Sequence, residues 1–189
     1  MRFRDKVALI SGAGSGIGRA TAQMIGAEGG TVVGVDLDQV GVEQIMDGIC
    51  RAGGKAHAIV ANALDAAQVA QVVQQTIEAC GRIDILVNAV GGSTIIPNAG
   101  ATVDELTLDE WQRLLVFNLN GTFLFCNAVV PIMKRQHSGK IVNISSIAGR
   151  GLSQSSSSAY SAAKGRDFLG VVHFSSFLSN GLPFPVFPQ

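Results

Sequence analysis

The stretch KVALISGAGSGIGRA, residues 6–20, decides the fold of this chain. Its first residues are mostly apolar, as in a buried strand, and a helical pattern begins at about residue 17. Between them, Gly12, Gly16 and Gly18 let the backbone turn tightly and come close to a ligand. A pyrophosphate held by such a turn lies against the N-terminus of the following helix, where free N–H groups favour an anion. Strand, glycine-rich turn and helix together predict a dinucleotide-binding unit.

Strand-like and helix-like patterns alternate along the rest of the chain. Several of the strand-like runs are continuously apolar, which is typical of a parallel sheet covered on both faces. The alternation predicts an α/β fold with a Rossmann-type, doubly wound parallel sheet. The expected strands are 6–11, 31–36, 56–61, 83–88 and 140–146, and the expected helices are 17–28, 39–51, 66–80, 107–135 and 159–179.

Asp36 ends the second expected strand and indicates which dinucleotide is bound. A carboxylate at this place can accept hydrogen bonds from ribose hydroxyls and repels a 2′-phosphate. No basic residue stands beside Asp36 or at Ser15 to bind that phosphate. The sequence therefore favours NAD over NADP as the cofactor.

Composition excludes several other classes of function. The chain has 189 residues, with 14 basic and 14 acidic side chains and no net charge. This length fits one domain, and the balanced charge gives no electrostatic reason to bind nucleic acid or an anionic membrane. We expect no apolar run that approaches the ~20 residues of a membrane span, and no leader before the first strand. We expect a cytoplasmic protein with a small-molecule substrate.

Cysteine and histidine give no sign of a metal site. Cys50, Cys80 and Cys126 are far apart and form no CxxC pair, and the three histidines are scattered. Neither set has the spacing of metal ligands, so no metal is predicted. The odd, dispersed thiols are typical of a reducing compartment.

Six segments together resemble the short-chain dehydrogenase/reductase family. The match differs from the family pattern at Asn62, where an Asp is usual, and at Ala89, which replaces the second Asn of an Asn-Asn-Ala-Gly segment. The segments are the glycine turn with its Gly12-x3-Gly16-x-Gly18 spacing, ANALD (61–65), VNAVGG (87–92), FNLNGTF (117–123), IVNISSIAG (141–149) and YSAAK (160–164).

The resemblance implies hydride transfer between a nicotinamide and a secondary alcohol or ketone, with Tyr160 as acid/base. A phenol ordinarily keeps its proton up to about pH 10, so a nearby cation is needed to favour phenolate. Lys164 lies four residues after Tyr160 and shares its helix face. The implied catalytic residues are Tyr160, Lys164, Ser146 (with Ser145 as the alternative) and Asn118. The implied cofactor-binding residues are Gly12, Ser15, Gly16, Ile17, Gly18, Asp36, Asn62, Ala63, Asn88, Ala89, Tyr160 and Lys164.

The family resemblance also carries expectations about assembly and substrate. It implies a homo-oligomer, a dimer or tetramer built on the helices at 107–135 and 159–179. The loop at 91–106 is long and mildly apolar, which fits a small, fairly hydrophobic substrate.

The end of the chain departs from the family pattern. Residues 168–189 contain no charged side chain, and Pro183, Pro185 and Pro188 remove donors that a central strand needs. We expect one domain over 1–181 and an atypical tail at 182–189, with the last strands of the family fold missing. The alternatives left open are a catalytically impaired chain that only binds the dinucleotide, and an unstable product without a biochemical role.

Overall fold

The structure, a computed structural model, describes residues 1–152 and 156–165. The expected helix beyond residue 165 and the expected tail at 182–189 lie outside the described residues. The described part contains a parallel sheet in the order β3-β2-β1-β4-β5. Its strands are β1 Val7–Ser11, β2 Thr31–Asp36, β3 Lys55–Val60, β4 Ile85–Asn88 and β5 Lys140–Asn143. The predicted Rossmann-type α/β fold is confirmed.

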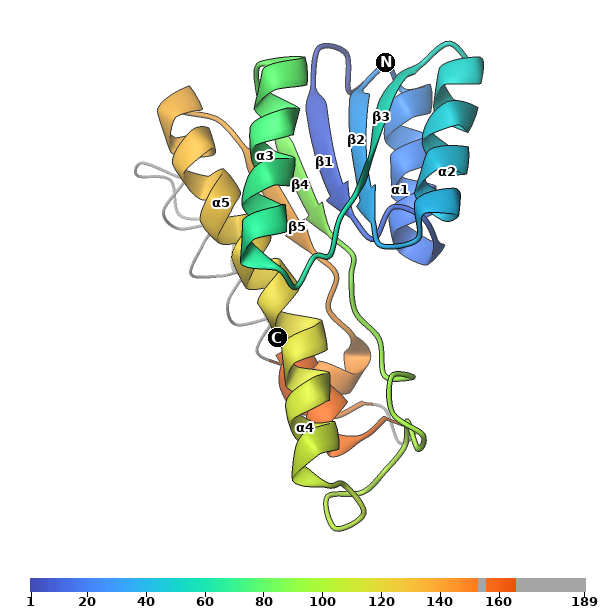
Figure 1. Ribbon diagram of the computed structural model, residues 1–189, viewed down its shortest axis with the longest axis vertical. Helices are drawn as coiled ribbons and strands as arrows, with labels where there is room; N and C mark the ends of the chain where they lie inside the picture. Colours follow the sequence, from blue (N-terminus) through green and yellow to red (C-terminus); the bar gives the residue numbers. More distant parts are fainter. Residues whose placement is uncertain (153–155, 166–189) are drawn as a thin grey trace.

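Helices cover both faces of the sheet (Figure 1). On one face lie α1, Gly16–Ala27, and α2, Gln39–Arg51. On the other lie α3, Ala66–Cys80, and α5, Gly121–Gln136. These positions follow from right-handed crossovers on either side of β1.

The central strand β1 supplies both hydrophobic cores, because successive side chains of a strand point to opposite faces. Ala8 and Ile10 pack in the cluster that α1 and α2 cover. Val7 and Leu9 pack with side chains of α3 and α5 on the opposite face. All four are at most 6% exposed, which explains why the run is continuously apolar.

The helix expected at 107–135 is interrupted. The structure has α4 at Leu108–Leu115, a π-helical turn at Val116–Asn120, and then α5. The Asn118 side chain explains the break, since its Nδ2 donates to Leu114 O at 2.9 Å and so competes with the regular helical ladder. α4 lies beyond the carboxyl ends of the strands (Figure 1).

The segment Leu108–Gln136 corrects one expectation from the sequence. This 29-residue helical stretch is long and apolar enough to span a membrane by length and composition. The core helix of a soluble protein passes the same test, and Phe125, Val129 and Met133 of α5 are fully buried against the sheet. Packing inside the domain explains these three side chains, and 28% of the segment's apolar window is buried in all.

Asp84 ties strands together at the edge of the sheet opposite the glycine turn. Its Oδ2 accepts from Val7 N at 2.9 Å and from Arg82 Nε at 2.8 Å, while Oδ1 accepts from Arg82 Nη2 at 2.6 Å. Burial by itself would raise the pKa of the Asp84 carboxyl. The hydrogen bonds from Arg82 and Val7, with the charges of Arg82 and Lys6, outweigh burial and hold that pKa below its ordinary value.

We predict that Asp84→Asn lowers the free energy of unfolding by about 1–3 kcal/mol at neutral pH. Because the folded carboxyl has a lowered pKa, its stabilisation is complete above the ordinary value of 3.8 and is lost as the pH falls through the folded pKa. The difference between wild type and variant should therefore shrink below about pH 4. Urea denaturation across pH measures this. Asp5→Asn, which removes an exposed acid nearby, is the control; equal losses in both variants would contradict the assignment.

Candidate active site

A cavity of about 850 Å³ opens at the carboxyl ends of the strands. It lies where the strand order reverses beside β1, which is where open α/β sheets bind ligands, and its volume is typical of such sites. Residues from seven separate segments therefore meet in one place. The lining residues are Gly12, Ser15, Gly16, Ile17, Val35, Asp36, Leu37, Ala61, Asn62, Ala63, Leu64, Ala89, Val90, Gly91, Phe117, Ile144, Ser145, Ser146, Tyr160 and Lys164.

The glycine turn forms the floor of the cavity at the start of α1. Gly12 has φ +73°, and a Cβ placed on Gly18 would lie 2.0 Å from Gly12 O, so this crossing excludes any side chain. Ser15 is the N-cap of α1, and its side chain makes no capping hydrogen bond. The first N–H groups of the helix thus face the cavity edge with the geometry that suits a phosphate group.

Asp36 is held in place by backbone amides. Its Oδ2 accepts from Gly14 N at 2.9 Å, and its Oδ1 accepts from Asp38 N at 3.0 Å. The carboxylate is thereby joined to the glycine turn. Among the described residues that line the cavity, Lys164 is the one Lys or Arg, so no cation stands beside Asp36 there.

The turn after β3 forms another wall. Asn62 Oδ1 accepts from Leu64 N at 3.0 Å, and Gln68 Oε1 accepts from Asn62 N at 2.8 Å. Asn62 therefore shapes the turn through its own side chain, although it replaces the Asp that the family pattern has there. Asn62 and Ala63 both line the cavity, as the sequence predicts.

Tyr160 and Lys164 lie on a helix described over residues 158–165. Lys164 is 4% exposed, and its Nζ donates to Ile144 O at 3.0 Å. Ser145 Oγ donates to Lys164 O at 2.8 Å. The helix is thus bonded twice to the segment that follows β5, and both of its predicted functional side chains reach the cavity.

Gly149 allows the segment after β5 to lie in close contact with the helix at 158–165. It lies in a 3₁₀ turn at Ile147–Arg150. A Cβ on Gly149 would lie 2.5 Å from Gly165 N and 2.5 Å from the Lys164 carbonyl carbon. Only a glycine allows the two backbones to approach this far.

The two serines after β5 differ in how their hydroxyls are used. The Ser145 proton is committed to Lys164 O, whereas Ser146 Oγ accepts from Ala148 N at 3.2 Å. As an acceptor in that bond, Ser146 keeps its own proton to donate. Both residues line the cavity.

Gly18, Asn88 and Asn118 are predicted site residues that do not line the cavity but lie behind it. Asn118 Oδ1 accepts from Gly92 N and its Nδ2 donates to Gly92 O, both at 2.9 Å. Asn88 Nδ2 donates to Asn143 Oδ1 at 2.8 Å and so bridges β4 and β5. These two amides support the cavity wall instead of facing the cavity.

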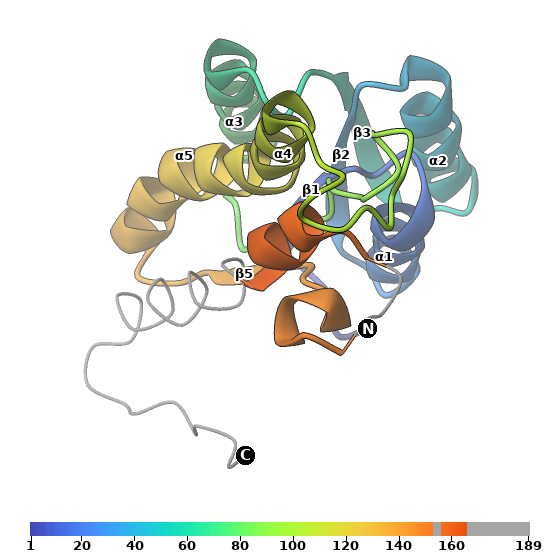
Figure 2. The ribbon, with the colours of Figure 1, turned by 90° about the horizontal axis from the view of Figure 1, so that it is seen from below.

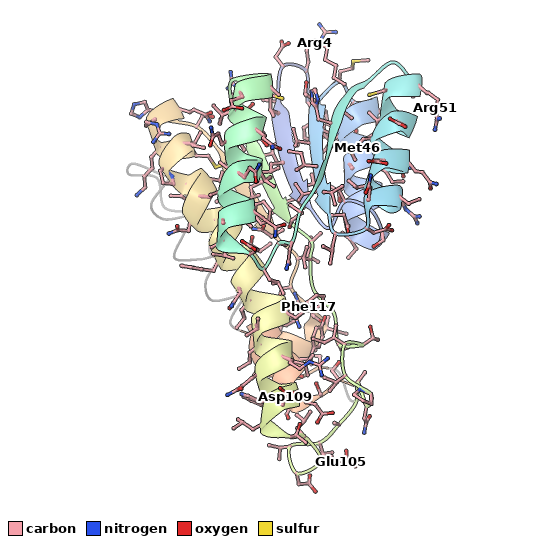
Figure 3. All side chains as sticks on the ribbon, in the orientation of Figure 1. Arg4, Met46, Arg51, Glu105, Asp109 and Phe117 are labelled. Atoms are coloured by element: carbon pink, nitrogen blue, oxygen red, sulfur yellow. The ribbon has the colours of Figure 1, made fainter. Side chains whose placement is uncertain are left out.

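Leu37, Gly91 and Phe117 line the cavity and were missed from the sequence. Phe117 lies on the π-helical turn (Figure 3). Gly91 could have been predicted from the sequence, because it belongs to VNAVGG, one of the segments that resemble the family. A Cβ on Gly91 would lie 2.8 Å from Asn118 Oδ1 and 2.9 Å from Lys164 Nζ, so a side chain there would collide with both.

Among residues 1–152 and 156–165, no group of three His, Cys, Asp or Glu side chains could hold a metal ion.

The fold is a Rossmann-type α/β fold, and comparison with known proteins identifies the family. The short chain dehydrogenase family matches residues 6–182, and the chain belongs to this family. A 3-oxoacyl-(acyl-carrier-protein) reductase of Thermotoga maritima is 37% identical over 153 residues, which are 79% of this chain and 58% of that protein. The chain thus spans less than two thirds of this relative.

Solved structures of relatives contain either nicotinamide dinucleotide. A 3-oxoacyl-(acyl-carrier-protein) reductase with bound NAD from Brucella melitensis has a TM-score of 0.85 and 32% identity, covering 93% of this chain and 66% of that one. A metagenomic short-chain oxidoreductase in complex with NADP has a TM-score of 0.85 and 29% identity, covering 94% of this chain and 78% of that one. The family therefore uses a nicotinamide cofactor, and the two neighbours differ in which one they hold.

We predict that Gly149→Ala lowers the free energy of unfolding by about 1–3 kcal/mol, because the new methyl group must push the Lys164–Gly165 backbone away. Denaturant unfolding measures the loss. Gly48→Ala is the matched control: it lies inside α2 with no atom within 4 Å of a built Cβ, and should stabilise by about 0.5–1 kcal/mol. An unchanged stability for Gly149→Ala would show that the close backbone contact does not exist in solution.

Proposed function

We propose that this chain is an NAD(H)-dependent oxidoreductase that transfers hydride between the nicotinamide and a secondary alcohol or ketone. The observation that carries the proposal is that one cavity joins the glycine turn, Asp36 and the Tyr160–Lys164 pair. These residues fit the dinucleotide, because the crossing of Gly18 over Gly12 leaves the α1 N-terminus open to a pyrophosphate.

Tyr160 is proposed to exchange a proton with the substrate oxygen. When bound, the nicotinamide supplies the hydride acceptor or donor. Lys164 brings a positive charge to the same cavity, and a positive charge close to a phenol favours its ionised form. Ser146 orients the substrate oxygen with the hydroxyl proton that it keeps, which favours it over Ser145.

Asn118 is proposed to act by positioning the wall of the cavity. Its side-chain hydrogen bonds go to the backbone of Gly92 and Leu114, so it holds the wall of the cavity against the helix. It shapes the place where Gly91 passes close to Lys164. In this way Asn118 supports proton transfer at Tyr160 from behind the cavity.

NAD is proposed over NADP because of Asp36. Its carboxylate is fixed by Gly14 and Asp38 at the edge of the cavity, where a 2′-phosphate would meet an uncompensated negative charge. Adenosine ribose hydroxyls, in contrast, can donate to the same oxygens. The adenine ring then lies toward the turn at Asn62 and Ala63.

We propose one domain over residues 1–181, a cytoplasmic location, a small fairly apolar alcohol or ketone as substrate, and no nucleic-acid partner. A homo-oligomer is supported by apolar side chains exposed on the interrupted helix, such as Val116 at 43% and Phe123 at 58%. Sedimentation velocity measures the number of copies.

We predict that Tyr160→Phe lowers kcat by about 10²–10⁴-fold while NADH still binds, because only the exchangeable proton is removed. Turnover with a panel of secondary alcohols and the fluorescence of bound NADH measure the two properties. Wild-type protein that binds NADH without any turnover would instead describe a catalytically impaired chain, and failure to bind NADH at millimolar levels would overturn the proposal entirely.

We predict that Asp36→Ala weakens NADH binding by about 10-fold or more, because two hydrogen bonds to a charged acceptor are lost. The affinity for NADPH should rise relative to NADH, since the repulsion of the 2′-phosphate is removed. Titration of both cofactors measures the ratio. Asp47→Ala, an exposed site in α2 with the same change in net charge, should leave the ratio as it is; a similar shift there would point to overall charge as the cause.

A further inference from the structure

We propose that Ser157 and the segment Ile95–Ala99 form a clamp that positions Tyr160. The clamp joins the loop after β4 to the buried cluster against which the acid/base residue Tyr160 packs. This inference rests on the proposed function, because it assigns Ser157 a role in the same reaction. Ser157 is a positioning residue and does not itself touch the reacting atoms.

Ser157 connects the loop after β4 to the helix that carries Tyr160. It is fully buried, and its N–H donates to Ala99 O at 2.9 Å. Its Oγ accepts from Tyr160 N at 3.3 Å, which is the bond a helix N-cap makes to the third helical residue. A buried hydroxyl in this place fixes the turn on which Tyr160 stands.

The same loop packs against the tyrosine side chain. Ile96, Leu114 and Ala159 form a small buried cluster, each at most 4% exposed, and Tyr160 and Trp111 pack against it. These residues come from the loop, from α4 and from the helix, three segments distant in the sequence. Figures 1 and 2 show that the loop between β4 and α4 lies at the same end of the molecule as the helix at 158–165, which is drawn in orange-red.

The other end of the segment is attached to α4. Arg113 Nη2 donates to Ile95 O at 3.0 Å. Arg113 Nη1 also lies 3.7 Å from the exposed Asp109 carboxylate. The segment is therefore held at Ile95 by Arg113 and at Ala99 by Ser157, with Ile96 buried between the two attachments.

This arrangement has a consequence for catalysis. A displacement of about 1 Å in a reacting group can cost about 10² in rate. A shift of the segment Ile95–Ala99 would move the cluster against which Tyr160 packs. Loosening either attachment of the segment should therefore lower kcat through the position of Tyr160.

The test compares Ser157→Ala with Ser158→Ala, its neighbour. Ser158 Oγ is buried with no hydrogen-bond partner, so removing it deletes a hydroxyl without breaking a bond. For Ser157→Ala we expect kcat to fall by about fivefold or more, with the dissociation constant of NADH unchanged. We also expect faster hydrogen exchange at the Tyr160 amide. For Ser158→Ala we expect neither change.

A second pair of variants tests the far attachment. Arg113→Ala releases Ile95 O, whereas Asp109→Ala removes the exposed ion pair and leaves that hydrogen bond intact. We expect faster exchange at the Ser157 amide in Arg113→Ala alone. Emission from Trp111, the only tryptophan of the chain, should shift in Ser157→Ala, since it packs in the same cluster as Tyr160.

The outcomes separate the clamp from a simple stabilising cap and from the proposed function. If Ser157→Ala lowers the free energy of unfolding but leaves kcat and Tyr160 exchange at wild-type values, the clamp is wrong. If wild-type protein turns over no alcohol or ketone, the proposed function fails, while hydrogen exchange and Trp111 emission still decide whether the clamp exists. Equal exchange rates at the Ser157 amide in Arg113→Ala and Asp109→Ala would also overturn the clamp.

Discussion

The contact between the end of β5 and the Lys164–Gly165 backbone is the constraint on which the candidate site depends. Two hydrogen bonds and one glycine bring these segments together, and the glycine matters because any side chain at Gly149 would occupy the space of the helix backbone. Without this contact, Tyr160 and Lys164 would sit on a helix with no fixed relation to the strand ends. The sheet provides an edge where ligands bind, and this contact places Tyr160 and Lys164 at that edge.

Much of the fold could be predicted from the sequence, because its determinants are local. The buried strands are continuously apolar runs, and α2 and α3 occupy the ranges that their helical patterns predict, 39–51 and 66–80. The fifth strand was predicted to reach residue 146 but ends at Asn143. The residues beyond it leave the sheet to bond with the Lys164 helix, which is a tertiary contact that an apolar pattern does not encode.

The parts of the site that were missed depend on contacts between distant residues. Leu37 follows a strand like any loop residue, and nothing near it in the sequence indicates that it lines a cavity. The serine-rich run before Tyr160 is low in complexity and indicates a loop that caps the next helix, but its pattern does not show that Ser157 is fully buried and bonded to Ala99. Asn118 was predicted from the family resemblance to be a catalytic residue that supports a proton-relay water, and its hydrogen bonds to Gly92 could only be seen in three dimensions.

The π-helical turn at Val116–Asn120 lets one long helix serve two separate interiors. Leu114 and Phe125 are eleven residues apart, a spacing that puts two side chains on nearly the same face of an unbroken α-helix. A π-helical turn acts like one inserted residue and rotates everything beyond it by about 100°. Leu114 can therefore face the tyrosine-side cluster while Phe125 faces the sheet. The turn therefore sets the rotation between the two faces: the same residues in an unbroken α-helix would direct both side chains to one side and leave one of the two interiors without its helix.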